Sequence, residues 1–73
     1  MARIRFTQHA NSYMMDHRIT VYDVIEVIGG YETIQQDVRQ TGLIRAGKML
    51  EERMVWVIYT AIGDSLLVVS VSD

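Results

Sequence analysis

The chain opens with a short stretch in which polar and apolar side chains alternate. Ile4 and Phe6 occupy one set of positions, and the intervening positions hold arginines. Because successive side chains of a strand point to opposite sides, Arg3 and Arg5 would lie on the side away from the core. The alternation predicts a strand over residues 2–6 with one solvated face.

A helix is predicted directly after this strand. Thr7 can cap its start, because a threonine hydroxyl accepts a hydrogen bond from a free N–H group of the first turn. Four side chains then recur at the i, i+3, i+4, i+7 spacing of one helical face: Ala10, Tyr13, Met14 and His17. This spacing indicates a helix with one side turned toward the rest of the domain.

A second helix is predicted from Thr20 to the Gly29-Gly30 pair. Thr20 and Asp23 have the spacing of a capping box, with Asp in the less usual acidic position. The apolar residues that recur on one face are Val21, Val24, Ile25 and Ile28. The two glycines supply a stop signal. Only Arg18-Ile19 separate the two helices, so we expect a tight pair on one side of the sheet.

The second half of the chain is strand-like. Residues 31–38 are polar and predict a strand at a sheet edge, and Thr41-Gly42 marks a turn. Residues 43–46 form a short run whose structure the pattern leaves open. The strongest strand covers residues 53–61, which are rich in β-branched and aromatic side chains. A short glycine-containing turn leads to a second strong strand over residues 66–72, as in a β-hairpin.

The two C-terminal strands are apolar on both faces, whereas the helix pair can cover only one face. Because the chain is short, it has no further element that could cover the other face. A dimer partner or a different protein would have to cover it. We expect a single α+β domain over residues 1–73. It would have a short N-terminal strand, two helices, and a mostly antiparallel sheet of three to four strands with the helices packed on one face.

Composition narrows the class of protein. The chain has 73 residues and no cysteine, so neither a disulfide nor a cysteine zinc site supplements its small core. The net charge of −2 disfavours nucleic-acid binding by bulk positive charge, but it leaves room for a local basic patch. No apolar run approaches the about 20 residues of a membrane span, and the N-terminus lacks a signal-peptide core. We expect a cytoplasmic prokaryotic protein with no membrane contact and no cofactor or metal.

Most side chains with plausible chemistry lie on the first predicted helix. His9, Tyr13 and His17 fall at i, i+4 and i+8, nearly in line along one face. A shared metal is disfavoured, because eight helical residues separate the two histidines by about 12 Å. A histidine with an ordinary pKa of about 6.5 can act as general acid or base. A metal-free ribonuclease site also needs a cation for phosphate charge and a second proton-transfer group. The candidate cations are Arg18, Arg5 and Arg45, and the candidate proton-transfer groups are Tyr59 and Tyr13.

The same residues also have structural explanations. His9 can bond to the start of a helix, Tyr13 can pack in the core, and Arg5 can belong to the exposed side of an edge strand. Trp56 is best explained as an anchor in a core or an interface. The residue types alone therefore leave both catalysis and packing open.

Residues 4–28 resemble a family of small uncharacterised prokaryotic domains with the pattern T-x-H-A-x-x-R-M-x-x-R-G-I between a strand and a helix. The matching residues are Thr7, His9, Ala10, Met14 and Ile19. Tyr13 and His17 stand at the two arginine positions, and Arg18 stands at the glycine position. The family is similar to the BrnT-like and RelE-like toxins of toxin–antitoxin pairs. The resemblance implies a small α+β, metal-independent ribonuclease held inactive by an antitoxin.

Two hypotheses follow. In the first, a toxin-like domain with degenerate catalytic residues acts mainly by protein–protein association, with a homo-oligomer or a small antitoxin-like protein as its partner. In the second, the domain is a metal-independent ribonuclease whose catalytic residues would be His9, Arg18 and Tyr59. Its binding residues would be Arg5, Tyr13, His17 and Arg45, and its partner would be RNA. We favour the first, because the C-terminal strands are apolar on both faces and both arginine positions hold other residues.

Overall fold

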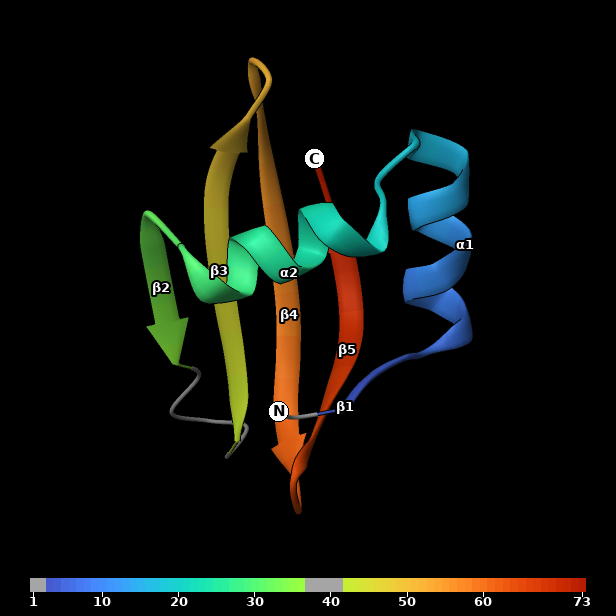
Figure 1. Cartoon of the computed structure of the whole chain (residues 1–73), viewed down its shortest axis with the longest axis vertical. Coiled ribbons are helices and arrows are strands. Elements are labelled where there is room, and N and C mark those ends of the chain that lie inside the picture. Colours follow the sequence, from blue (N-terminus) through green and yellow to red (C-terminus); the bar gives the residue numbers. More distant parts are fainter. Residues whose placement is uncertain (1–2, 37–41) are drawn as a thin grey trace.

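A computed structural model of the chain describes residues 3–36 and 42–73, which form two helices and five strands (Figure 1). The elements in chain order are β1 (Arg3–Phe6), α1 (Gln8–His17), α2 (Val21–Gly29), β2 (Thr33–Gln36), β3 (Leu43–Leu50), β4 (Arg53–Ile62) and β5 (Ser65–Ser72). The strands form one sheet in the order β1-β5-β4-β3-β2. The predicted α+β class is confirmed, and the sheet has five strands rather than three to four.

Short strands form both edges of the sheet. β1 pairs with β5 in parallel, so that Phe6 lies opposite Val68. The other neighbouring strands are antiparallel. The polar segment after α2 forms the opposite edge as β2, and all four of its residues are exposed. Short edge strands limit unwanted pairing with other chains.

Two tight hairpins join the three long strands. Glu51 and Glu52 form the β3–β4 turn with φ values of 47° and 72°. Two positive φ values in succession match the twist of a type I′ hairpin turn. Gly63 has a φ of 61° in the β4–β5 turn, which glycine adopts without a Cβ clash. The hairpin predicted for the two strong strands is confirmed, and the run at residues 43–46 belongs to the longer strand β3.

Thr7 caps α1 and also ties it to the sheet. Its Oγ1 accepts a hydrogen bond from the N–H group of Ala10 at 3.1 Å, as predicted. The same hydroxyl donates to the carbonyl of Val69 on β5 at 2.9 Å. The start of α1 is therefore fixed at the point where the pairing between β1 and β5 ends.

The end of α1 uses a backbone conformation that favours glycine. Arg18 is left-handed, with φ 55° and ψ 42°. The N–H group of Ile19 donates to the carbonyl of Met14 at 2.9 Å, and both of these side chains are buried. This combination is typical of a Schellman end, where glycine is the commonest left-handed residue. Arg18 therefore occupies a position that a glycine would fill without a Cβ clash.

Helix α2 begins with the predicted capping box. The N–H group of Asp23 donates to Thr20 Oγ1 at 3.1 Å. The N–H group of Thr20 donates to Asp23 Oδ2 at 2.9 Å. Two free N–H groups of the first turn are thereby satisfied by one reciprocal pair.

The buried face predicted for α2 is partly wrong. Val24 is buried and Ile28 packs against the core, but Val21 and Ile25 are 49% and 45% exposed. Val27 is fully buried in their place. The reason is that the apolar side of α2 is broad, and the sheet covers only the part of it that carries Val24, Val27 and Ile28.

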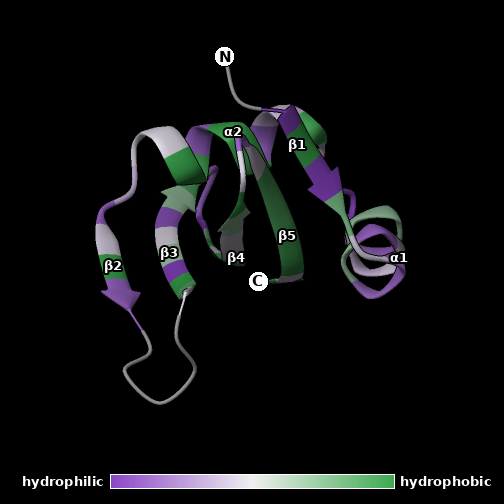
Figure 2. Ribbon diagram, turned by 90° about the horizontal axis from the view of Figure 1, so that it is seen from below, coloured by the Kyte–Doolittle hydropathy of each residue, from purple (hydrophilic) through white to green (hydrophobic). Residues whose placement is uncertain are grey.

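Both helices contribute to one core. α2 crosses β3 and β4, and α1 runs alongside β5 beyond the end of β1 (Figures 1 and 2). A β-bulge at Ile58/Tyr59 lets Val68 and Val71, three residues apart, face the same side of the sheet. The buried apolar residues are Ala10, Met14, Ile19, Val24, Val27, Ala46, Val55, Val57, Tyr59, Val68 and Val71.

Three sequence predictions extend outside the described residues. They are the first position of the N-terminal strand, positions 37–38 of the edge strand, and Thr41 of the predicted turn. Within residues 3–36 and 42–73, neither helix is long and apolar enough to cross a membrane.

Candidate interaction surface

One face of the sheet is covered by no element of the described chain. On β4, Val55 and Val57 are fully buried in the core. Because side chains alternate along a strand, Trp56 between them points to the opposite side. The strand register identifies the side chains that share this side. We call this surface the open face, and its main side chains are Leu43, Arg45, Met49, Met54, Trp56, Ile58 and Leu67. On β5, the polar Ser70 and Ser72 lie opposite Ile58 and Trp56.

Trp56 lies at the centre of the open face, between Arg45 and Gly47. The guanidinium carbon of Arg45 is 4.1 Å from the ring centroid, a cation–π distance. Gly47 is the cross-strand partner of Trp56. A Cβ atom on Gly47 would come within 2.5 Å of two ring carbons. The missing side chain on β3 therefore makes room for the indole, and Arg45 holds it in place.

Apolar side chains flank Trp56 on the open face. Met54 and Ile58, two positions away along β4, are half-buried, and Met49 is 52% exposed. Next to Leu67, at the rim where β1 meets β5, the surface forms a hollow of about 350 Å³. The hollow is lined by Arg5, Phe6, Ile62, Ser65 and Leu67.

The charge of the open face is positive, although the chain as a whole is acidic. Arg45 lies at its centre and Arg5 at its β1 rim. The five strands of the described chain contain no aspartate or glutamate at all. The open face therefore combines apolar side chains with unopposed arginines.

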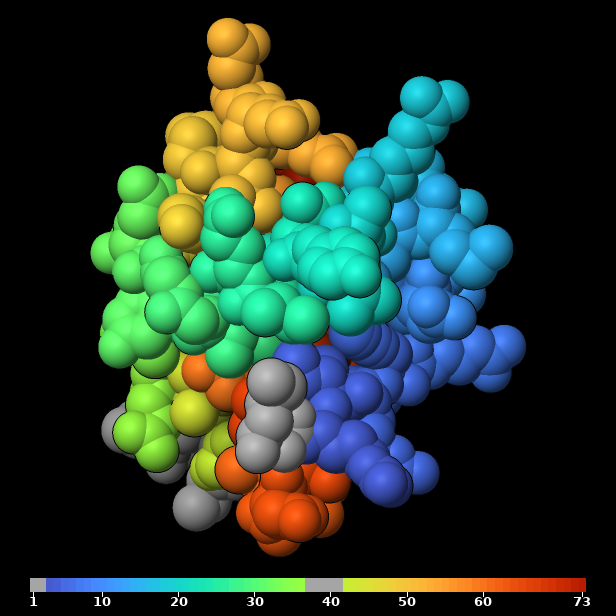
Figure 3. Space-filling model, in the orientation of Figure 1, coloured from blue at the N-terminus to red at the C-terminus, as the bar shows by residue number. Residues whose placement is uncertain are grey.

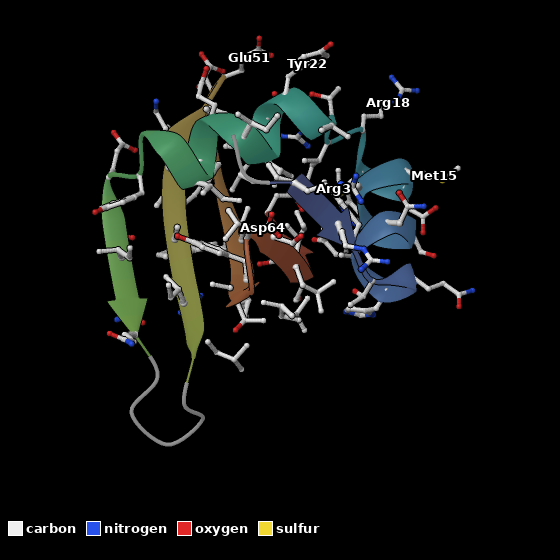
Figure 4. The ribbon with its side chains drawn as sticks, turned by 60° about the horizontal axis from the view of Figure 1, so that its bottom comes forward. Arg3, Met15, Arg18, Tyr22, Glu51 and Asp64 are labelled. Carbon is white, nitrogen blue, oxygen red and sulfur yellow. The ribbon has the colours of Figure 1, made fainter. Side chains whose placement is uncertain are left out.

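A second apolar surface lies on the outer side of α2. Val21, Tyr22 and Ile25 are 49%, 82% and 45% exposed. Tyr22 projects outward from the helix (Figure 4), and α2 lies across the front of the space-filling view with this side uncovered (Figure 3). The charged residues of α2 are Asp23 and Glu26, both acidic. We call Val21, Tyr22, Ile25 and these carboxylates the outer face of α2.

Four polar side chains meet where the end of α1 approaches the ends of β4 and β5. Asp73 accepts hydrogen bonds from the Tyr13 hydroxyl at 2.7 Å and from Arg53 Nη1 at 2.9 Å. His17 Nδ1 lies 3.1 Å from Asp73 Oδ1, and the His17 and Tyr13 rings stack with centroids 3.8 Å apart. Arg53 also donates to the carbonyls of His17 and Arg18. This polar cluster ties the end of α1 to both strands.

Hydrogen bonding within the polar cluster shifts two pKa values. The bond from the Tyr13 hydroxyl is the main cause that lowers the pKa of Asp73, and the positive charge of Arg53 acts in the same direction. The same bond raises the pKa of Tyr13, because it stabilises the protonated phenol. At neutral pH the cluster therefore holds an ionised Asp73 and a neutral Tyr13.

The structure brings two of the predicted binding residues together and separates the predicted catalytic residues. Tyr13 and His17 belong to the polar cluster. His9 is exposed in the first turn of α1, and Arg18 follows its last turn, so about 14 Å of helix lies between them. Tyr59 lies in the core, only 7% exposed, and burial raises its pKa.

The two remaining predicted residues lie on the open face. Arg5 and Arg45 belong to β1 and β3, which are separated by two strands, or about 14 Å at ordinary strand spacing. Sequence reasoning missed Arg53 and Asp73, which meet only through strand pairing and carry no spacing signal. The period of two along β4 was a signal that could have placed Trp56 on the open face.

No group of three or more histidine, aspartate or glutamate side chains within residues 3–36 and 42–73 is placed to hold a metal ion. No family model, curated protein or solved structure matches the chain. Function therefore has to be inferred from the open face, the outer face of α2 and the polar cluster.

Proposed function

We propose that this domain acts by protein–protein association through its open face, in the cytoplasm, as a toxin-like α+β domain without a working ribonuclease site. The observation that supports this proposal is an apolar surface on β3 and β4, extended by Leu67 of β5 and centred on Trp56, that no element of the described chain covers. A contiguous apolar surface of this kind marks an interaction site. Covering it would contribute about 25 cal/mol for each Å² of apolar area removed from water.

The open face suits a protein partner better than RNA. Proteins that bind single-stranded RNA stack bases on exposed aromatic rings. Here one side of the Trp56 ring is occupied by Arg45, 4.1 Å away, and Gly47 lies close against the ring. The flanking Met49 and Met54 are flexible, polarisable side chains that adapt well to protein surfaces.

The alternative function is metal-independent RNA cleavage. It is favoured by the exposure of His9 beside the junction of β1 and α1. Cleavage also needs a cation for the charge that develops on the phosphate. Arg18 lies at the other end of α1 and Tyr59 lies in the core. Arg5, another candidate cation, lies on β1 four positions before His9.

Trp56 offers a direct test of association, because it is the only tryptophan of the chain. We expect acrylamide quenching of its fluorescence to fall as protein concentration rises from micromolar to millimolar. Ile58→Lys on the open face should keep Trp56 quenchable at every concentration. Met15→Lys is the matched control, because Met15 is 74% exposed on α1, which lies alongside β5.

Two results would count against the proposal. One is quenching of Trp56 that does not change with concentration. The other is cleavage of RNA without added metal by the wild type but not by His9→Ala, which would establish the ribonuclease function instead.

A further inference from the structure

Helix α2 has a broader apolar side than its contact with the core uses. Six of its nine residues are valine, tyrosine or isoleucine, and the exceptions are Asp23, Glu26 and Gly29. The apolar side of an amphipathic helix normally packs against another surface. Within the chain, Val24 and Val27 are fully buried in the core, whereas the outer face of α2 is exposed. The composition of α2 therefore calls for a second layer of packing.

The outer face of α2 and the open face are complementary in charge. The open face carries Arg45 and Arg5 and no carboxylate. The outer face of α2 carries Asp23 and Glu26 and no basic residue of its own, and Lys48 of β3 lies 3.7 Å from Glu26. Opposite charges arranged around apolar centres favour correct pairing and suppress wrong pairing. A second copy of this chain thus offers both the apolar and the acidic groups that the open face lacks.

Two open faces are a poorer match for each other. In a two-fold symmetric contact the same patch meets itself. With the axis through the centre of the open face, Arg45 would lie near Arg45 of the other copy, and neither set of strands has an aspartate or glutamate to offset them. Such like-charge contacts are unfavourable, so the charge pattern disfavours a symmetric sheet-to-sheet dimer.

The length of α2 fits the open face. Nine helical residues span about 14 Å, which is close to the width of three strands at about 4.8 Å each. In its own chain α2 already crosses β3 and β4 on the core side (Figure 1). The same helix from a second copy can cross the same strands from the opposite side.

We propose that the outer face of α2 in one copy packs on the open face of the next copy. This inference rests on the proposed function and names a second copy as the partner. Val21 and Ile25 would cover the apolar centre at Trp56, and Glu26 would lie toward Arg45. Because the two surfaces differ, each contact leaves one of each kind free, and the assembly grows head-to-tail into rings or filaments.

The size of the contact makes it concentration-dependent. The contact is limited by α2, which is about 14 Å long and about 10 Å wide. That is roughly 140 Å² of projected area for each copy, far below the about 800 Å² that a partner buries in an interface of standard size. We therefore expect association in the micromolar range or weaker.

Lysine variants on each surface test the pairing. Ile25→Lys alters the outer face of α2, and Ile58→Lys alters the open face. Met49→Lys is a second, more exposed open-face variant for the case in which Ile58→Lys disturbs folding, which circular dichroism would reveal. Each variant should weaken self-association in sedimentation equilibrium by about tenfold or more, because it places an unpaired lysine in an apolar contact. Met15→Lys should behave like the wild type.

An equimolar mixture of Ile25→Lys and Ile58→Lys is the decisive sample. The first variant keeps an intact open face and the second keeps an intact α2. The pairing therefore predicts a complex of two chains that grows no further, whereas the wild type continues to grow with concentration. A mixture that stays monomeric would overturn the inference.

Other outcomes separate this inference from the proposed function. Self-association that protects Trp56 but is unchanged by Ile25→Lys would overturn the role of α2 and leave association through the open face in place. Trp56 that stays fully quenchable in wild-type protein at millimolar concentration would overturn both.

Discussion

The guanidinium of Arg45 lies 4.1 Å from the centroid of the Trp56 ring, on the face of the sheet opposite the core. A large aromatic side chain on an uncovered strand usually needs a neighbouring element to fix it. Here a cation on the adjacent strand serves instead, and Gly47 on that strand leaves room for the indole. The result is an apolar centre with a positive charge beside it, which sets the kind of partner that fits.

Replacement of Gly47 by alanine should displace the Trp56 ring. The new Cβ would lie 2.5 Å from ring carbons, much closer than van der Waals contact allows. We expect a loss of about 1–3 kcal/mol of unfolding free energy, typical of overpacking, together with a changed Trp56 emission spectrum. Urea unfolding and fluorescence would measure both effects.

The matched control is Gly29→Ala at the end of α2, where a Cβ meets nothing within 4 Å. Alanine favours the helix, so this variant should be neutral or slightly stabilising. Equal destabilisation by both substitutions would show that glycine backbone effects, rather than contact with Trp56, explain the result.

Arg18→Gly should stabilise the domain. Arg18 holds a left-handed conformation that costs a residue with a Cβ about 1–2 kcal/mol. The greater unfolded-state entropy of glycine offsets part of that gain, so we expect a net increase of about 0.5–1 kcal/mol in thermal or urea unfolding. Arg18→Ala keeps the strain and should not stabilise. If alanine stabilised as much as glycine, the benefit would come from removal of the arginine side chain.

Replacement of Arg53 by lysine should destabilise the fold. Its guanidinium donates to Asp73 and to the carbonyls of His17 and Arg18. A lysine has no planar fork with which to reach these acceptors together. Because Arg53 is partly exposed, we expect a loss of only about 1 kcal/mol for Arg53→Lys in urea unfolding.

Arg3→Lys on the exposed side of β1 is the control for Arg53→Lys and should be close to neutral. A similar loss for both substitutions would mean that lysine is disfavoured for general reasons rather than at the polar cluster.

Asp73 should make part of the free energy of unfolding dependent on pH. The Tyr13 hydrogen bond holds the pKa of Asp73 below its ordinary value, so below about pH 4 the unfolded chain takes up a proton before the folded chain does. The stabilising contribution of Asp73 is therefore fully present above that pH and is lost as the pH falls through the pKa of Asp73 in the folded chain.

Asp73→Asn should reduce the difference in unfolding free energy between neutral pH and about pH 3, as measured by urea titration. Asp64→Asn, in the exposed β4–β5 turn, is a control that should leave the difference unchanged. Parallel pH profiles for the wild type and Asp73→Asn would rule out a role for this carboxyl.

Local chemistry made most of the fold predictable. Thr7 and the Thr20–Asp23 pair cap the two helices as expected, because capping depends on residues only three positions apart. The hairpin over β4 and β5 was equally local, since β-branched runs and a glycine turn specify it. The candidate site was less predictable. His9, Arg18 and Tyr59 were chosen by residue type, and the structure spreads them over an exposed helix start, a helix end and the core.

The sequence by itself determined the class of fold, the helix ends and the presence of a strand over residues 53–61 that is apolar on both faces, because each of these depends on neighbouring residues. Only the tertiary structure decided which side of α2 meets the sheet, that β1 closes the sheet beside β5, and that Arg53 and Asp73 meet. These relationships arise from contacts between segments that are distant in the sequence. Local patterns do not distinguish among the possible arrangements of such segments, and the free energy of burying apolar surface selects one of them.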